Sequence, residues 1–342
     1  MSRTTKEKRA RFRTLHESGC FVLPNPWDAG TARILQHLGF EAIASTSAGF
    51  AWSTGRPDYV LPREDILAHV RDLSRAVDLP VNADFEAGFG DGPEGVAESV
   101  KLAIATGVAG LSIEDRDVSK SGLYDTAMSL ERLKAARAAI DNSGEDVILV
   151  ARTEGLLFDP SALTPAIDKL VAFADAGADC LYAPGVRDAS DIAQMVKAVA
   201  PKPVNVVMMK PGLSLAELAD LGVRRVSVGG ALARVMWASV TAVAEEDQGR
   251  PLRRPPLGHA RSHAQRGLRQ FRTNVKPRRK EDYLRSNHAS DEFIKFSPND
   301  YPLDGQGTTL PRSLAGSSAA VTGKQVATAN PRTERRRSGG ET

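Results

Sequence analysis

The sequence predicts a (β/α)8 barrel of the TIM type over residues 20–246, followed by a basic tail. Short apolar segments rich in Val, Ile, Leu and Ala recur along this stretch, as expected for parallel strands buried on both faces. Amphipathic segments of helix length separate them, and this alternation is typical of a parallel sheet. Eight such units over roughly 230 residues fit the size of one barrel.

The predicted strands and helices follow one another with short connections. The eight predicted strands are Cys20–Pro24, Ala42–Ser45, Val81–Asp84, Gly110–Glu114, Val147–Arg152, Cys180–Ala183, Val204–Met208 and Arg225–Val228. The clearest helices are Arg63–Ala76, Glu94–Ala105, Leu130–Ile140 and Thr164–Ala176. Several helices end in glycine, as at Gly107 and Gly177, which suits a left-handed C-terminal cap. A doubly wound open sheet is the alternative, but no segment marks a reversal of strand order.

Charge divides the chain into two parts. Residues 1–246 carry 26 Lys and Arg against 33 Asp and Glu, a balance of −7, whereas residues 247–342 carry 19 against 9, a balance of +10. Residues 1–19 are predicted to form a helical lead-in. Residues 247–342 lack an apolar period and are predicted to be largely disordered. Because this tail shows no aromatic interleaving and no recognisable nucleic-acid motif, binding to nucleic acid is not expected.

Composition also indicates the compartment. No apolar run approaches the length of a membrane span, and the charged N-terminus lacks the apolar region of a secretion signal. We therefore expect a cytoplasmic protein. Cys20 and Cys180 both lie in apolar runs, which predicts buried free thiols in a reducing environment.

Polar residues follow several predicted strands directly. In a barrel these C-terminal strand ends face one another at the same end, where the active site lies. Asp84 and Glu86 follow the third strand, Glu114 ends the fourth and Arg152 ends the fifth. Carboxylates at the ends of buried strands are costly unless a cation compensates them, and Mg²⁺ is the simplest such cation. These strand ends therefore predict a metal-dependent active site.

The motifs at these strand ends resemble those of the phosphoenolpyruvate mutase/isocitrate lyase superfamily, over Phe21 to about Glu246. The matching segments begin at Leu23 (Leu-Pro-Asn-Pro-Trp-Asp-Ala-Gly), Thr46 (Thr-Ser-Ala-Gly), Gly55 (Gly-Arg-Pro-Asp), Asp84 (Asp-Phe-Glu-Ala-Gly-Phe-Gly), Ile113 (Ile-Glu-Asp) and Ala151 (Ala-Arg-Thr-Glu). Each segment is weak by itself, but their order and their positions after strands one to five make the match specific.

The resemblance implies a (β/α)8 barrel in a homo-oligomer, usually a tetramer that exchanges its eighth helix. It also implies that Mg²⁺, or Mn²⁺ in its place, chelates a small 2-oxo carboxylate substrate. On this match Asp84 binds the metal directly, while Glu86, Glu114 and Asp58 hold it partly through water. The tail has no counterpart in the superfamily, which leaves the exchanged assembly open.

The resemblance further assigns the residues that hold the substrate. Thr46, Ser47 and Ala48 match the segment whose amides and hydroxyl bind the substrate carboxylate. Arg152 matches an arginine that grips the carboxylate or polarises the oxo group, and its fixed guanidinium fork suits this role. An ion pair at the barrel mouth with a neighbouring glutamate is the alternative for Arg152, and both roles could coexist.

One departure from the superfamily concerns acid–base chemistry. The lyase branch carries a Lys-Lys-Cys-Gly-His loop after strand four, but residues 116–125 here contain neither cysteine nor histidine. Cleavage of isocitrate or 2-methylisocitrate by the usual route is therefore not expected. Tyr124 or Lys120 could supply a proton from a mobile lid, although a solvent-facing role is the alternative for each.

The function predicted from these residues is that of a Mg²⁺-dependent lyase or decarboxylase. It would act on a small 2-oxo or 2-hydroxy acid through an enolate-like intermediate. The alternatives are chemistry on the P–C bond of a phosphonopyruvate-type substrate and a Schiff-base aldolase that uses Lys210. An inactive barrel acting as a binding scaffold is a further alternative, which the retained carboxylates argue against.

Overall fold

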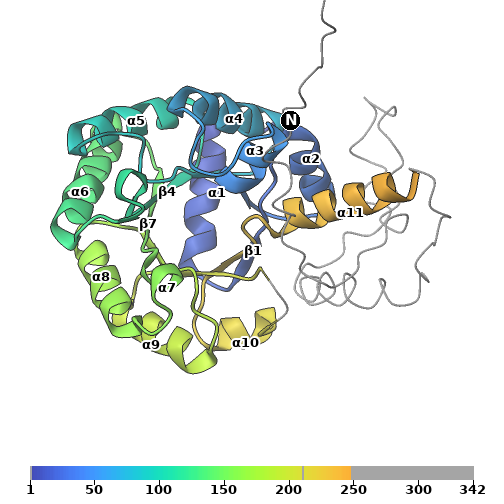
Figure 1. Cartoon of the computed structure of the whole chain (residues 1–342). Helices are drawn as coiled ribbons and strands as arrows, with labels where there is room; N and C mark the ends of the chain where they lie inside the picture. The colour runs from blue at the N-terminus through green and yellow to red at the C-terminus, as the bar shows by residue number, and fades with distance from the viewer. Residues whose placement is uncertain (1, 210–211, 248–342) are drawn as a thin grey trace, which may run out of the picture. The chain divides into compact units, whose positions relative to one another are not determined.

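Eight parallel strands form the barrel in the computed structural model, which describes residues 2–209 and 212–247 (Figure 1). Their order in the sheet is β1-β10-β9-β8-β7-β4-β3-β2. The two ends of this order meet where the amide of Ala44 in β2 donates to the carbonyl of Pro24, just after β1 (3.0 Å). The strands are β1 (Phe21–Leu23), β2 (Ile43–Ala44), β3 (Val81–Asp84), β4 (Gly110–Glu114), β7 (Ile148–Arg152), β8 (Cys180–Tyr182), β9 (Val204–Val207) and β10 (Arg225–Ser227). The predicted barrel is confirmed, and the doubly wound alternative is wrong.

Helices surround the strands as an outer ring (Figure 1). The helices of the ring are α2 (Ala29–His37), α4 (Arg63–Ala76), α5 (Pro93–Ala105), α6 (Thr126–Ser143), α8 (Leu163–Asp175), α9 (Ala189–Val199) and α10 (Leu215–Asp220). The last helix, α11 (Ala231–Asp247), extends away from this ring (Figure 1). All four helices named from the sequence are present, with bounds that differ by at most a few residues. Shorter elements lie in the segments that follow β2, β4 and β7. Two are the helices α3 (Ser47–Ser53) and α7 (Gly155–Phe158). The third is a hairpin of β5 (Arg116–Asp117) and β6 (Gly122–Leu123), joined by the 3-10 turn η1 (Val118–Lys120).

Helix α1 (Thr5–Glu17) covers the N-terminal end of the barrel and leaves the opposite end open. Phe12 is fully buried and packs in one cluster with side chains of β1, β7 and β8. The Arg9 side chain donates to the carbonyls of Val108 (3.0 Å) and Ile104 (2.8 Å), just before β4 begins. The predicted lead-in is thus a helix that closes the bottom of the core.

Two further predictions from composition meet the structure. Cys180 is buried as expected, but Cys20 is only half-buried, because it precedes β1 at the rim; both thiols are free. Within residues 2–209 and 212–247, no helix is long and apolar enough to cross a membrane. The predicted tail from residue 248 onward, and Lys210, lie outside the residues that the structure describes.

His69 on α4 gives the fold a measurable acid sensitivity. Its ring stacks on Phe50 (3.8 Å between centroids), its Nε2 is buried without a hydrogen-bond partner, and burial lowers its pKa to about 4. The unfolded chain takes up a proton at His69 below about pH 6.5, whereas the folded chain does not. The contribution of His69 to the free energy of unfolding is therefore complete above about pH 6.5 and is lost toward pH 4.

We therefore expect the free energy of unfolding of His69→Phe, relative to that of the native chain, to increase by about 2 kcal/mol when the pH falls from 8 to 5. Phenylalanine keeps the stacking on Phe50 and removes the titrating group. Urea unfolding of both chains at the two pH values measures the difference. His37→Phe, on an exposed position of α2, is the matched control. A difference that does not change with pH would show that His69 is protonated at no cost in the folded protein.

Candidate active site

Three neighbouring strands bring the predicted charged residues to the open end of the barrel. Asp84 ends β3, Glu114 ends β4 and Arg152 ends β7. The strand register places Glu114 directly beside Arg152 and Asp84 beside Ser112. The side-chain period of the strands then turns these residues toward a common centre. The structure therefore brings together the three strand-end residues that the sequence placed at one end of the barrel.

Arg152 is held between carboxylates. Its Nε lies 2.5 Å from Glu154 Oε1 and 3.2 Å from Glu114 Oε2, and its Nη1 lies 3.5 Å from Asp84 Oδ1. The guanidinium also sits over the ring of Tyr182, 5.2 Å from its centroid. Burial disfavours the cation, but Glu114 and Glu154 outweigh burial and raise the pKa of Arg152 well above its ordinary value. The ion pair considered from the sequence exists, and it fixes the guanidinium at the mouth.

The carboxylates of the site are electrostatically coupled and under-compensated. Burial, followed by the charges of Asp84 and Asp58, raises the pKa of Glu86 to about 9. Burial also raises the pKa of Glu114 to about 8, despite the opposing effect of Arg152. The pKa of Asp58 is raised by burial and by Asp84. The structure thus brings together all four predicted metal-binding residues, and Arg152 alone does not offset the burial and mutual repulsion that disfavour their ionisation.

Backbone geometry explains the glycines after Glu86. Glu86 itself adopts a positive φ of 45°, and Gly88 follows at φ 87°. A Cβ on Gly90 would lie 2.3 Å from the backbone carbon of Gly95, so only glycine lets the loop pack against the start of α5. The loop is tied to β4, because the carbonyl of Glu86 accepts from the amide of Glu114 (2.9 Å).

The segment after β2 contacts the acidic residues directly. The Ser47 amide donates to Asp84 Oδ2 (2.9 Å), and the Ser47 side chain favours the charged form of Asp58 and so opposes the rise of its pKa. Thr46 caps α3, since its hydroxyl accepts from the Gly49 amide (3.2 Å). Ala48 follows in the first turn of α3 and is half-buried. The predicted substrate-binding segment therefore lies at the site, but the Ser47 amide already binds the carboxylate of Asp84.

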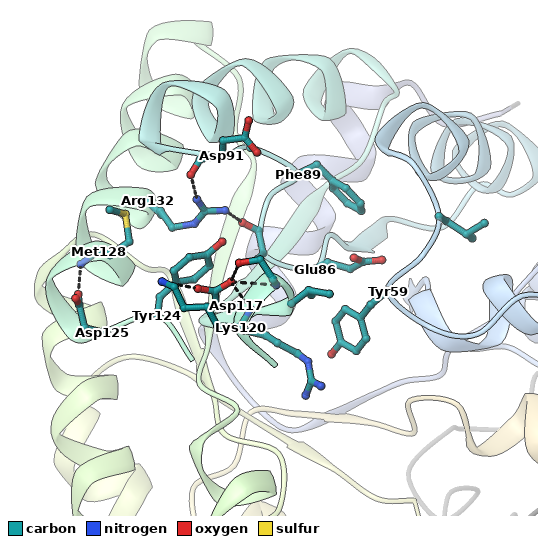
Figure 2. Close-up of a pocket in the computed structure, with 16 residues that line it drawn as sticks. Tyr59, Glu86, Phe89, Asp91, Asp117, Lys120, Tyr124, Asp125, Met128 and Arg132 are labelled. Carbon is teal, nitrogen blue, oxygen red and sulfur yellow. Dashed lines mark hydrogen bonds and ion pairs between the residues drawn. The ribbon is translucent and has the colours of Figure 1, made fainter. Parts of the chain in front are cut away.

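Tyr124 and Lys120, the predicted proton donors, line a cavity beside this centre (Figure 2). The Tyr124 ring lies under the guanidinium of Arg132, 4.5 Å from its centroid. Lys120 is 78% exposed and pairs with Asp117 (3.0 Å). Within the described residues, Tyr124 therefore contacts Arg132 on α6 and Lys120 contacts Asp117 on β5, and neither pairs with Arg152. The structure thus places Tyr124 near the site and directs Lys120 toward solvent.

One residue at the site, Tyr59, was not singled out from the sequence. It lies one residue after Asp58 with φ 65°, and burial and the negative charge of Glu114 raise its pKa, so it stays protonated. The only signal for Tyr59 was its position beside a predicted ligand. Asp115, one of the strand-end carboxylates, is 2% exposed and accepts from the Glu154 amide (2.8 Å).

The donor set fits a hard divalent cation. All four predicted ligands offer carboxylate oxygens, which Mg²⁺ prefers. Glu114 Oε1 is buried and has no hydrogen-bond partner, which is unfavourable without a further positive charge or donor. In the described part of the chain no three Asp, Glu, His or Cys side chains are close enough to bind one ion directly. The arrangement therefore suits an ion that keeps several water ligands.

Comparison with known proteins identifies the family of the chain. Residues 12–247 match the family model for phosphoenolpyruvate phosphomutase. A crystal structure of a candidate lyase/mutase from Burkholderia cenocepacia J2315 is 48% identical, with a TM-score of 0.69, and the match covers 72% of this chain and 90% of that one.

Two curated enzymes are more distant relatives. The oxaloacetate decarboxylase of Pseudomonas paraeruginosa is 31% identical over 66% of this chain and 80% of that enzyme. The 2-methylisocitrate lyase of Escherichia coli is 31% identical over 50% of this chain and 60% of that lyase. The family model and these relatives support a lyase or mutase activity. The chain therefore belongs to the phosphoenolpyruvate mutase/isocitrate lyase superfamily.

Proposed function

We propose that this protein is a Mg²⁺-dependent lyase or decarboxylase that acts on a small 2-oxo or 2-hydroxy acid through an enolate-like intermediate. The observation that supports it most directly is the group of four coupled carboxylates around Arg152, with the pKa values of Glu86 and Glu114 raised to about 9 and about 8. Such a charge imbalance at a barrel mouth is costly in a scaffold and useful in a cation-dependent enzyme.

The proposed ligands are Asp84, which would bind the metal directly, with Asp58, Glu86 and Glu114 holding its water ligands. A bound Mg²⁺, or Mn²⁺, would supply an electron sink for the 2-oxo group. Arg152 would grip the substrate carboxylate, because its guanidinium is already oriented by Glu154 and Tyr182.

Decarboxylation suits this set of side chains. The bond to the departing carboxylate breaks, CO₂ leaves with no base required, and the electron pair remains on the carbon chain as an enolate. A proton must then reach that carbon. Tyr124 in the adjacent cavity, or the protonated Tyr59, would donate or relay it. The oxaloacetate decarboxylase relative supports the same reaction class.

The homo-oligomer expected from the resemblance stays a prediction. It is supported by apolar side chains that α11 exposes, because large apolar groups in contact with water are typical of interfaces. The side chains concerned are Val235 (43% exposed), Trp237 (36%) and Val240 (50%).

The test is formation of pyruvate from oxaloacetate and related 2-oxo and 2-hydroxy acids, with Mg²⁺ and with EDTA. Because Mg²⁺ alone decarboxylates oxaloacetate slowly, the blank contains Mg²⁺ without protein. We expect turnover at least tenfold above that blank, lost in EDTA and inhibited by oxalate. Turnover confined to phosphonopyruvate would replace the proposal by P–C bond chemistry. No turnover, together with no thermal stabilisation by oxalate and Mg²⁺, would leave the scaffold alternative.

A further inference from the structure

A cavity of about 540 Å³ opens beside the candidate active site. It lies between the loops that follow β2, β3 and β4 and the first turns of α6 (Figure 2). Tyr59 and Glu86 line this cavity and also belong to the acidic site. The cavity and the acidic site are therefore adjacent and share these two side chains.

Of the three cationic side chains that line the cavity, Arg116 has no acceptor among the described residues. Lys120 pairs with Asp117, and Arg132 donates to the carbonyls of Ala87 (2.6 Å) and Asp91 (3.5 Å). In contrast, the Arg116 side chain forms no hydrogen bond or ion pair with the described residues, and its Nε is buried without a partner. A half-buried guanidinium in this state is unfavourable unless a ligand completes it.

Two aromatic rings hold Arg116 in place. Its guanidinium carbon lies 4.7 Å from the centroid of Tyr59 and 5.1 Å from that of Phe158. Contacts with ring faces stabilise the flat faces of a guanidinium and leave its N–H edges available. Those edges match a carboxylate, which they can bind with two parallel hydrogen bonds.

The Tyr59 ring connects this arginine with the acidic site. The charge of Glu114 raises the pKa of its hydroxyl, while its face contacts Arg116. Tyr59 thus lies between the acidic site and Arg116, so a substrate with its 2-oxo acid end at Arg152 could direct its far end toward Arg116. We propose that Arg116 is a specificity-determining residue that binds a second carboxylate, so that the enzyme prefers 2-oxo or 2-hydroxy diacids to monoacids. This inference rests on the proposed function.

The test compares full-length native protein with Arg116→Gln and Arg116→Lys, each with Mg²⁺. The substrate is oxaloacetate, or whichever diacid the native protein turns over fastest, and the reference ligand is oxalate, which resembles the 2-oxo acid end of the substrate alone. We expect Arg116→Gln to lower kcat/KM for the diacid by about 10- to 100-fold, mainly through KM, with Arg116→Lys intermediate. The inhibition constant of oxalate should change less than about twofold. Arg75→Gln, an equal charge change on an exposed position of α4, should match the native protein.

The possible results separate this inference from the proposed function. If the native protein neither turns over any of these acids nor binds oxalate, the proposed function is wrong and the role of Arg116 with it. If the native protein is active but Arg116→Gln keeps the diacid KM, or if monoacids are equal or better substrates, only the role of Arg116 is wrong. If Arg116→Gln weakens oxalate inhibition by the same factor as it lowers kcat/KM for the diacid, Arg116 supports the acidic site instead of binding the second carboxylate.

Discussion

Asp84→Asn is expected to lower Mg²⁺-dependent turnover by about a thousandfold or more. Asp84 is the proposed direct ligand, and loss of metal stabilisation of the developing negative charge is worth about 4 kcal/mol, or three orders of magnitude in rate. Asparagine keeps the shape of the side chain and can still accept from the Ser47 amide, which binds Asp84 Oδ2 at 2.9 Å. The change therefore removes charge while it preserves the local hydrogen bond.

Calorimetric titration with Mg²⁺ and steady-state kinetics of the same preparation measure this effect. Asp72→Asn, an exposed aspartate on α4, is the matched control and should behave as the native protein. Thermal unfolding without metal verifies the fold of the variant. Because neighbouring Glu86 and Asp58 lose a repelling charge, we expect the metal-free variant to be no less stable than the native chain. Unchanged Mg²⁺ affinity would remove Asp84 from the metal site.

The barrel could be predicted because its signals are local. Each buried strand is a short apolar run, and all eight runs occur where the structure has strands, with β3 and β4 matching at both ends. Parallel strands also end on the same side, so Asp84, Glu114 and Arg152 could be assigned to one centre without knowledge of any contact. The repeated pattern of the chain thus predicted both the fold and the end of the barrel at which the candidate site lies.

The parts that escaped prediction depend on loop conformation. The hairpin β5–β6 has strands of two residues and begins with the charged Arg116, so no alternation marks it. Tyr59 lies near Glu114 with a positive φ, a backbone conformation that a tyrosine rarely adopts and that no sequence pattern indicates. The partners of Ser47 likewise follow from the folded loop, and they place its amide on Asp84.

A buried ion pair behind the site provides the second large expected effect. Asp115 accepts from Lys169 Nζ (2.7 Å) on α8, from the Thr153 hydroxyl (2.7 Å) and from the Glu154 amide (2.8 Å). Lys169 also donates to the carbonyl of Tyr124 (3.0 Å), so one ammonium joins α8 to the loop before α6. The Asp115 side chain is fully buried, and that of Lys169 is 11% exposed.

Lys169→Met is therefore expected to destabilise the fold by about 3–5 kcal/mol, because it leaves the Asp115 carboxylate buried without a cation. Urea unfolding at neutral pH measures the loss. Lys134→Met, an exposed lysine on α6, is the matched control and should change stability by less than about 0.5 kcal/mol. Adding Asp115→Asn to Lys169→Met should recover part of the loss, since the buried charge is then removed.

Activity gives this prediction a second measurable consequence. Asp115 holds the Glu154 amide, and Glu154 in turn holds Arg152 through a 2.5 Å contact. If the pair orients Arg152, then Lys169→Met must lower kcat at a temperature where the variant is still folded. The double variant must not restore kcat, because the neutral side chain that Asp115→Asn introduces accepts from the Glu154 amide more weakly than a carboxylate does. If stability falls and kcat does not, the ion pair supports α8 alone, and Glu154 keeps Arg152 oriented without it.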